Sequence, residues 1–132
     1  MNYKLLERKN PQTAEQPGKY YAQLMSSSQI TIDQLATRIS ATCTVTRHDC
    51  LAVLSALQEQ IIYALQEGKR VNLDDVGHFR LVALGSGSDT PADYDLSYLK
   101  RIKVAFIPNK RLRNAVSLQS GNLKFTRVIS QE

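Results

Sequence analysis

The sequence has few cysteines and no long apolar run. Its 132 residues include two cysteines, Cys43 and Cys50, which are too few for a disulfide framework and are typical of a reducing compartment. No apolar run approaches the roughly 20 residues that cross a bilayer, and the start MNYKLLERKN has no apolar signal core. These absences predict a cytoplasmic protein that has no membrane partner.

Patterns typical of catalysis or metal binding are missing as well. Cys43, His48 and Cys50 have the spacing C-x4-H-x-C, but zinc normally takes four ligands and the only other histidine is His78. The loop GSGSD lacks the G-K-[ST] ending of a phosphate loop. No nucleophile stands in a recognisable elbow or beside a base. We therefore expect no enzymatic activity, no cofactor, no metal and no small-molecule substrate.

Positive charge is abundant and is concentrated in one segment. The formal net charge is +5, and residues 100 to 113 contain six cations and no carboxylate. Net charge is evidence about association and not about fold. The segment is therefore open to two interpretations: a solvated strand face followed by exposed helix charges, or a surface that binds a polyanion.

Two capped helices are predicted in the first half of the chain. Thr31 and Gln34 have the spacing of a capping box, and Thr46 caps a second helix after the short link CTV. The second helix is long and apolar on more than one side, which predicts burial on more than one side. Gly68 is expected to end it.

Beta structure is predicted to follow. KRVNL and HFRLVAL read as strands around the turn DDVG, and GSGSDTPADYD reads as a flexible loop or arm. A third strand is predicted over about 99 to 107, with alternate residues apolar. Pro108 should end that strand, and Asn109 should cap a short helix KRLRNAVSL.

The ends of the chain are predicted to lie outside this domain. Residues 1–28 form an N-terminal extension, in which YKLLER and KYYAQLM could pair as a hairpin. Residues 29–118 form the main domain, and residues 119–132 form a tail that could contain a strand.

The order of elements and several motifs resemble the bacterial histone-like family of HU and integration host factor. The resemblance covers about residues 29 to 118. The motifs that carry it are Gly68 at the helix end, the strand from Val71, the Gly77-x-Phe79 pair, and the pattern F-x-P-x-K-x-L that starts at Phe106. It implies an α+β fold: a helical hairpin, a three-stranded antiparallel sheet with a β-arm, and a short C-terminal helix, in an intertwined dimer.

The resemblance also implies a function and a set of site residues. Members of this family bind double-stranded DNA through the phosphate backbone and the minor groove, with little sequence preference, and they bend or package it in the nucleoid. Lysine and arginine supply such affinity by neutralising phosphates. The DNA-binding candidates carried over onto this sequence are Arg80, Lys100, Arg101, Lys103, Lys110, Arg111, Arg113 and, as weaker candidates, Lys69 and Arg70.

The tip of the arm departs from the family pattern. An R-N-P type of tip, whose proline wedges between base pairs, is replaced by a stretch in which Pro91 is flanked by Asp89, Asp93 and Asp95. Carboxylates repel phosphates, so we do not expect Pro91 to insert. RKNPQT, from Arg8, resembles the missing tip but lies in the extension, and we interpret it as a coincidence unless the extension folds toward the DNA.

The acidic tip and the added ends leave a second hypothesis open. The chain could be a structural or protein-interaction module that keeps the fold, pairs its strands with neighbours, and has lost strong DNA binding. A stable dimer that shows no duplex binding at low salt would favour this alternative.

Overall fold

The computed structural model describes residues 1–13 and 15–129, which belong to two compact units. The central unit is Thr31–Ala115, and the terminal unit combines Met1–Ile30 with the chain from Val116 onward. The central unit contains α1 (Ile32–Thr42), α2 (Arg47–Gln66), β3 (Val71–Asn72), β4 (Gly77–Gly85), β5 (Leu99–Pro108) and α3 (Lys110–Ala115). The terminal unit contains β1 (Asn2–Arg8), β2 (Lys19–Leu24) and β6 (Thr126–Arg127).

The caps of the helical hairpin are the ones that the sequence predicted. The Thr31 side chain accepts a hydrogen bond from the Gln34 N–H, and the Thr31 N–H donates to the Gln34 side chain at 2.9 Å. The Thr46 side chain caps α2. At the other end of α2, Gly68 has a φ of 78°, and the N–H of Lys69 reaches back to the Ala64 carbonyl. This is a Schellman motif, and glycine supplies its left-handed residue without strain.

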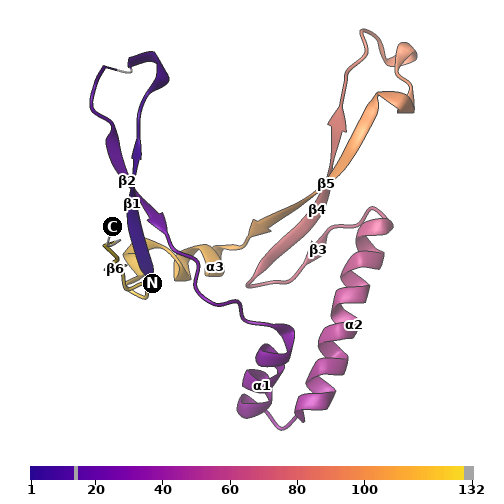
Figure 1. Ribbon diagram of the computed structural model, residues 1–132. Coiled ribbons are helices and arrows are strands. Elements are labelled where there is room, and N and C mark those ends of the chain that lie inside the picture. Colours follow the sequence, from indigo (N-terminus) through magenta and orange to yellow (C-terminus); the bar gives the residue numbers. More distant parts are fainter. Residues whose placement is uncertain (14, 130–132) are drawn as a thin grey trace. The chain divides into compact units, whose positions relative to one another are not determined.

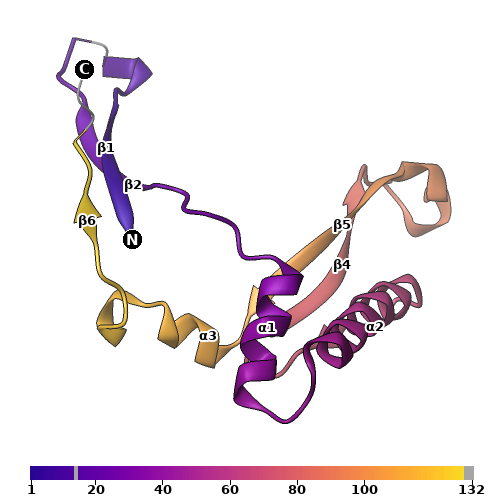
Figure 2. The ribbon, with the colours of Figure 1, turned by 60° about the horizontal axis from the view of Figure 1, so that its bottom comes forward.

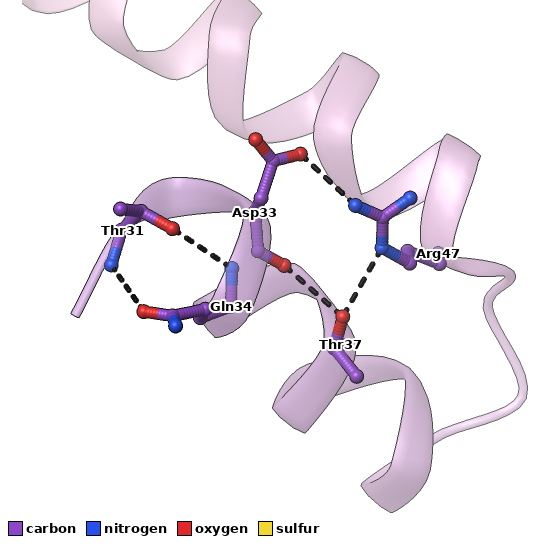
Figure 3. A network of polar contacts seen from close by, with 5 residues as sticks. All are labelled: Thr31, Asp33, Gln34, Thr37 and Arg47. Atoms are coloured by element: carbon purple, nitrogen blue, oxygen red, sulfur yellow. Dashed lines mark hydrogen bonds and ion pairs between the residues drawn. The ribbon is translucent and has the colours of Figure 1, made fainter.

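A polar network ties the start of α1 to the start of α2 (Figure 3). The Arg47 guanidinium lies 3.1 Å from the Asp33 carboxylate and donates to the Thr37 hydroxyl at 3.1 Å. The Thr37 hydroxyl in turn donates to the Asp33 carbonyl. Both charged side chains are substantially exposed, so the network orients the hairpin more than it stabilises the fold.

The central sheet has the antiparallel order β3-β4-β5, as predicted, and β4 and β5 extend beyond β3 as a two-stranded arm (Figure 1). The base of this arm requires a glycine at position 77. A Cβ on Gly77 would lie 2.6 Å from the Ile107 carbonyl oxygen and 2.6 Å from the Phe106 ring. This close approach explains the Gly77-x-Phe79 pair of the sequence.

Three local predictions need correction. The predicted strand KRVNL is reduced to Val71–Asn72, so Lys69 and Arg70 precede it. The final helix ends at Ala115, and Ser117 then begins a separate 3-10 turn over Leu118–Ser120. The arm tip, predicted as a flexible loop, contains two further 3-10 turns, Pro91–Asp93 and Leu96–Tyr98.

The terminal unit is a three-stranded sheet of order β2-β1-β6 (Figure 2). β1 and β2 pair antiparallel, which confirms the hairpin expected from YKLLER and KYYAQLM. β6 pairs parallel with β1, and the amino group of Met1 donates to the Lys124 carbonyl at 2.8 Å. The two ends of the chain, predicted as a separate extension and tail, therefore form one sheet.

The single chain buries very little of its apolar surface. Among the described residues, the buried hydrophobic side chains are Ala36, Cys50 and Leu65. Large side chains of α2 and β5 remain open, with Val53 64% and Val104 55% exposed. The predicted burial of α2 on more than one side is therefore not reached within one copy of the chain.

Candidate nucleic-acid interface

The register of β4 and β5 sorts the arm into an apolar face and a cationic face. Residues directly opposite one another share a face, and successive pairs alternate between the two faces. Phe79 pairs with Phe106, and their rings lie 4.9 Å apart. The apolar face consists of Phe79, Leu81, Ala83, Ile102, Val104 and Phe106.

The cationic face holds three of the predicted DNA-binding residues. Arg80 pairs with Ala105, Lys103 with Val82 and Arg101 with Leu84, so the cations stand one pair apart along one face. All three are exposed. Because each pairs with an apolar residue and not with a carboxylate, their charges remain available to an external anion.

A bulge near the end of the arm gives Lys100 a different environment. The ladder skips a residue between the pairs of Leu84 and Gly85, and Gly85 pairs with Leu99. Lys100 lies in this irregularity, and its ammonium group donates to the Ser97 carbonyl at 3.0 Å. Bulges re-aim side chains, so Lys100 does not continue the row of three cations.

The arm tip is folded, and its carboxylates accept hydrogen bonds within it. The Thr90 hydroxyl donates to the Asp93 carboxylate at 2.7 Å, and the Asp93 N–H donates back to that hydroxyl. Hydrogen bonds from the Ser97 side chain and from its backbone N–H lower the pKa of Asp95. The lowered pKa keeps Asp95 ionised at neutral pH, and Pro91 occupies the start of a closed turn.

Two of the cations in α3 lie near the acidic turn between β3 and β4. Arg111 forms an ion pair of 2.5 Å with Asp75 in the turn between β3 and β4. Lys110 lines a shallow hollow with Asp74 and Asp75. Arg113 lies one turn after Lys110 in the helix. The aspartates of the β3–β4 turn therefore partly neutralise this end of the predicted site, which the sequence did not predict.

Asn109 joins α3 to the sheet through several hydrogen bonds. Its side-chain oxygen lies 3.2 Å from Nδ1 of His78, and its amide group donates to Asn72 at 3.2 Å and to the Asp74 carbonyl. The Asn109 carbonyl accepts from the Arg113 N–H. These contacts hold the strand-to-helix corner, and those of the Asn109 side chain connect residues more than 30 positions apart in sequence.

The two weaker candidates are separated from the arm face. Lys69 forms an ion pair of 2.9 Å with Glu67, and Arg70 follows it before β3. Of the nine predicted residues, Arg80, Arg101 and Lys103 are brought together on one face. Lys100, Lys110, Arg111, Arg113, Lys69 and Arg70 lie outside this row.

The cysteines do not form a metal site. Within the described residues, no group of three or more histidine, cysteine or acidic side chains could hold a metal ion. Burial raises the pKa of the Cys50 thiol, and the neighbouring Cys43 raises it further. Across the same residues, no helix is long and apolar enough to cross a membrane.

The sequence matches a family model over residues 1–124: HU-HIG, an HU domain fused to wHTH, Ig, or glycine-rich motif. The match covers most of the chain, including the terminal strands β1 and β2. The chain belongs to the HU-HIG family. No curated protein matched the sequence.

Two solved structures resemble this HU-HIG chain. A “Putative bacterial DNA binding protein” from Bacteroides vulgatus has a TM-score of 0.61 and 16% identity, with 96% of this chain and 48% of that chain covered. The chain thus spans about half the length of that protein. The HU protein of an Anabaena HU–DNA cocrystal structure has a TM-score of 0.54 and 24% identity, with 67% of this chain and 99% of that chain covered. At these identities the likeness establishes the fold.

Proposed function

We propose that the chain binds double-stranded DNA with little sequence preference and bends or packages it in the bacterial nucleoid. The observation that carries the proposal is the row of Arg80, Lys103 and Arg101 on one face of the β4–β5 arm. Membership in an HU family and the Anabaena HU–DNA structure support it. The row contacts phosphates and no base edges, so it gives affinity without sequence readout.

We also propose that the DNA-binding form is a homodimer. The apolar face of the arm and the outer side of α2 are open in one chain, with Ile102 50% and Ile62 55% exposed. A second copy covers such surfaces without a new partner. Sedimentation should give twice the 14.8 kDa mass of one chain, and a monomer at the concentrations used for binding would contradict the dimer.

A salt titration of duplex binding tests the function. Each phosphate contact lowers the slope of log K against log salt by about 0.9, so three arm cations per chain in a dimer predict a slope near −5. Affinity should then fall by roughly a thousandfold between about 50 and about 200 mM salt. Affinity that barely changes over this range would contradict the proposal.

The structural or interaction module remains the second candidate. The observation that favours it is the arm tip, where Asp93 and Asp95 are held in folded turns by Thr90 and Ser97. Duplex binding that is undetectable at low salt, from a stable dimer, would favour this function over the first.

A further inference from the structure

The tip of the β1–β2 hairpin gathers cations around a hollow of about 560 Å³. Arg8 and Lys9 approach it from the end of β1, and Lys19 from the start of β2. All three side chains are exposed. The hollow is also lined by polar groups that can donate hydrogen bonds, from Asn10, Thr13 and Gln16. Among its described lining residues there is no carboxylate.

Strand pairing forces two of these cations together. Arg8 and Lys19 are directly opposite in the ladder, so their side chains leave the hairpin on the same face. Like charges at such positions destabilise a strand pair. An anion between them converts this repulsion into two favourable contacts.

Arg8 is also held in place by an aromatic ring. Its guanidinium lies 5.9 Å from the centroid of the Tyr21 ring, and Tyr21 stands on the same face as Arg8 and Lys19. A guanidinium over a ring face is attracted to it. Such a guanidinium keeps N–H donors at its edge, and these suit a phosphate oxygen.

Two acids lie near the hollow without lining it. Glu7 pairs with Tyr20, on the opposite face of the hairpin from Arg8 and Lys19, and its carboxylate lies with the Lys9 side chain beside Gly18. Glu15 lies in the loop but does not line the hollow. Over the terminal unit as a whole, the sequence has six lysines and arginines and three glutamates, a net +3, whereas the larger central unit has a net +2 from 11 cations and nine acids.

We propose that the hairpin tip is a second phosphate-binding site, where Arg8, Lys9 and Lys19 contact the phosphodiester backbone of double-stranded DNA. The proposal rests on the proposed function, because it adds phosphate contacts to those of the β4–β5 arm. The ligand chemistry is a phosphate group with two free oxygens, which a DNA backbone or inorganic phosphate could supply.

The test compares three charge-neutralised forms of the full chain in duplex binding at several salt concentrations. The tip variant is Arg8→Gln, Lys9→Gln, Lys19→Gln. The arm variant is Arg80→Gln, Arg101→Gln, Lys103→Gln. The control variant is Arg38→Gln, Lys124→Gln, Arg127→Gln, which removes the same charge from exposed positions outside both sites. Circular dichroism and thermal unfolding establish that each variant folds.

The tip variant should weaken the salt dependence relative to the control. Loss of three phosphate contacts per chain, six in the dimer, changes the slope by about 5, so between about 50 and about 200 mM salt the affinity should fall by a factor roughly a thousandfold smaller than for the unmodified chain. A tip variant that matches the control in slope and affinity overturns the proposal. So does a tip that is saturated by inorganic phosphate, seen in the amide spectra of Arg8 and Lys19, while duplex binding is unaffected by the tip substitutions.

The arm variant separates this inference from the proposed function. If the arm variant loses affinity for duplex DNA and the tip variant does not, the second site is contradicted and the proposed function is supported. If the tip variant loses affinity for duplex DNA and the arm variant matches the control, the tip site is supported and the arm site is contradicted. If the unmodified chain does not bind duplex DNA at low salt, both are overturned.

Discussion

The β4–β5 arm and the β1–β2 hairpin share a design but differ in the charge of their tips. Both are antiparallel ladders in which the register collects cations on one face: Arg80, Arg101 and Lys103 in the arm, Arg8 and Lys19 in the hairpin. The arm tip is acidic and folded into 3-10 turns, whereas the hairpin tip is basic around a hollow. Two ladders that both carry cations on one face therefore end in tips of opposite charge.

The two ladders also differ in how firmly each is held at a glycine. Gly77, at the base of the arm, faces a backbone carbonyl and a packed phenylalanine ring. Gly18, near the hairpin tip, faces the side chains of Glu7 and Lys9, which can move. The arm thus depends on the close approach of β4 to β5 at Gly77. The hairpin can accommodate a larger residue at position 18, because side chains there can move aside.

Charge reversal on the arm face should have the largest effect. Arg101→Glu with Lys103→Glu removes two phosphate contacts in each chain and adds two repulsions, so duplex affinity at low salt should fall by at least about 100-fold and the salt slope should weaken by about 2 per chain. Thermal unfolding should be unchanged, because neither residue forms an ion pair within the arm ladder. A large drop in melting temperature would show that these residues support the fold instead.

The two glycines should respond differently to the same substitution. Gly77→Ala forces apart two strands and should destabilise the central unit by about 1–3 kcal/mol, as overpacked sites do. Gly18→Ala displaces flexible side chains and should cost within about 0.5 kcal/mol. Urea unfolding of both variants measures the difference. Equal destabilisation would remove this contrast between arm and hairpin.

Neutralising the arm tip should strengthen DNA binding by a smaller factor. Asp93→Asn with Asp95→Asn removes two carboxylates from the end of a cationic ladder, and we expect a gain of a few-fold at low salt that disappears as salt screens the charges. A duplex-binding isotherm at two salt concentrations measures it. Weaker binding after this change would show that the tip contacts DNA through its folded turns.

The smallest predicted effect is a pKa change at the arm tip. Ser97→Ala removes the hydroxyl that lowers the Asp95 pKa, which should then rise toward the ordinary aspartate value. Because the folded-state pKa is depressed, the stabilisation of the turn is present above the unfolded value of 3.8 and is lost as pH falls through the lower folded pKa. Carboxyl NMR titration of both forms measures the shift, and identical curves would contradict the assignment.

Local features of the fold could be predicted from the sequence. The caps at Thr31 and Thr46 and the left-handed Gly68 depend on residues within one helical turn. The two faces of β5 followed from alternation, because a strand sends successive side chains to opposite sides. The row of Arg101 and Lys103 was therefore predictable, and the register extends it to Arg80.

Features that join distant segments could not be predicted in the same way. The parallel pairing of β6 with β1 brings together residues more than 120 positions apart, and no local pattern encodes it. The ion pair of Arg111 with Asp75 likewise depends on how α3 meets the β3–β4 turn. The cations of the hairpin tip were visible in the sequence, but only the pairing of Arg8 with Lys19 places them on one face.

Lysine acetylation of the full chain, with and without duplex DNA, tests the central claim most directly. Lys103 lies on the cationic face of the arm, and Lys124 is an exposed lysine of the terminal unit outside both proposed sites. Mass spectrometry reads the modification of each lysine separately. We predict that bound duplex protects Lys103 and leaves Lys124 unprotected. Equal modification of Lys103 in the presence and absence of bound duplex would contradict the account.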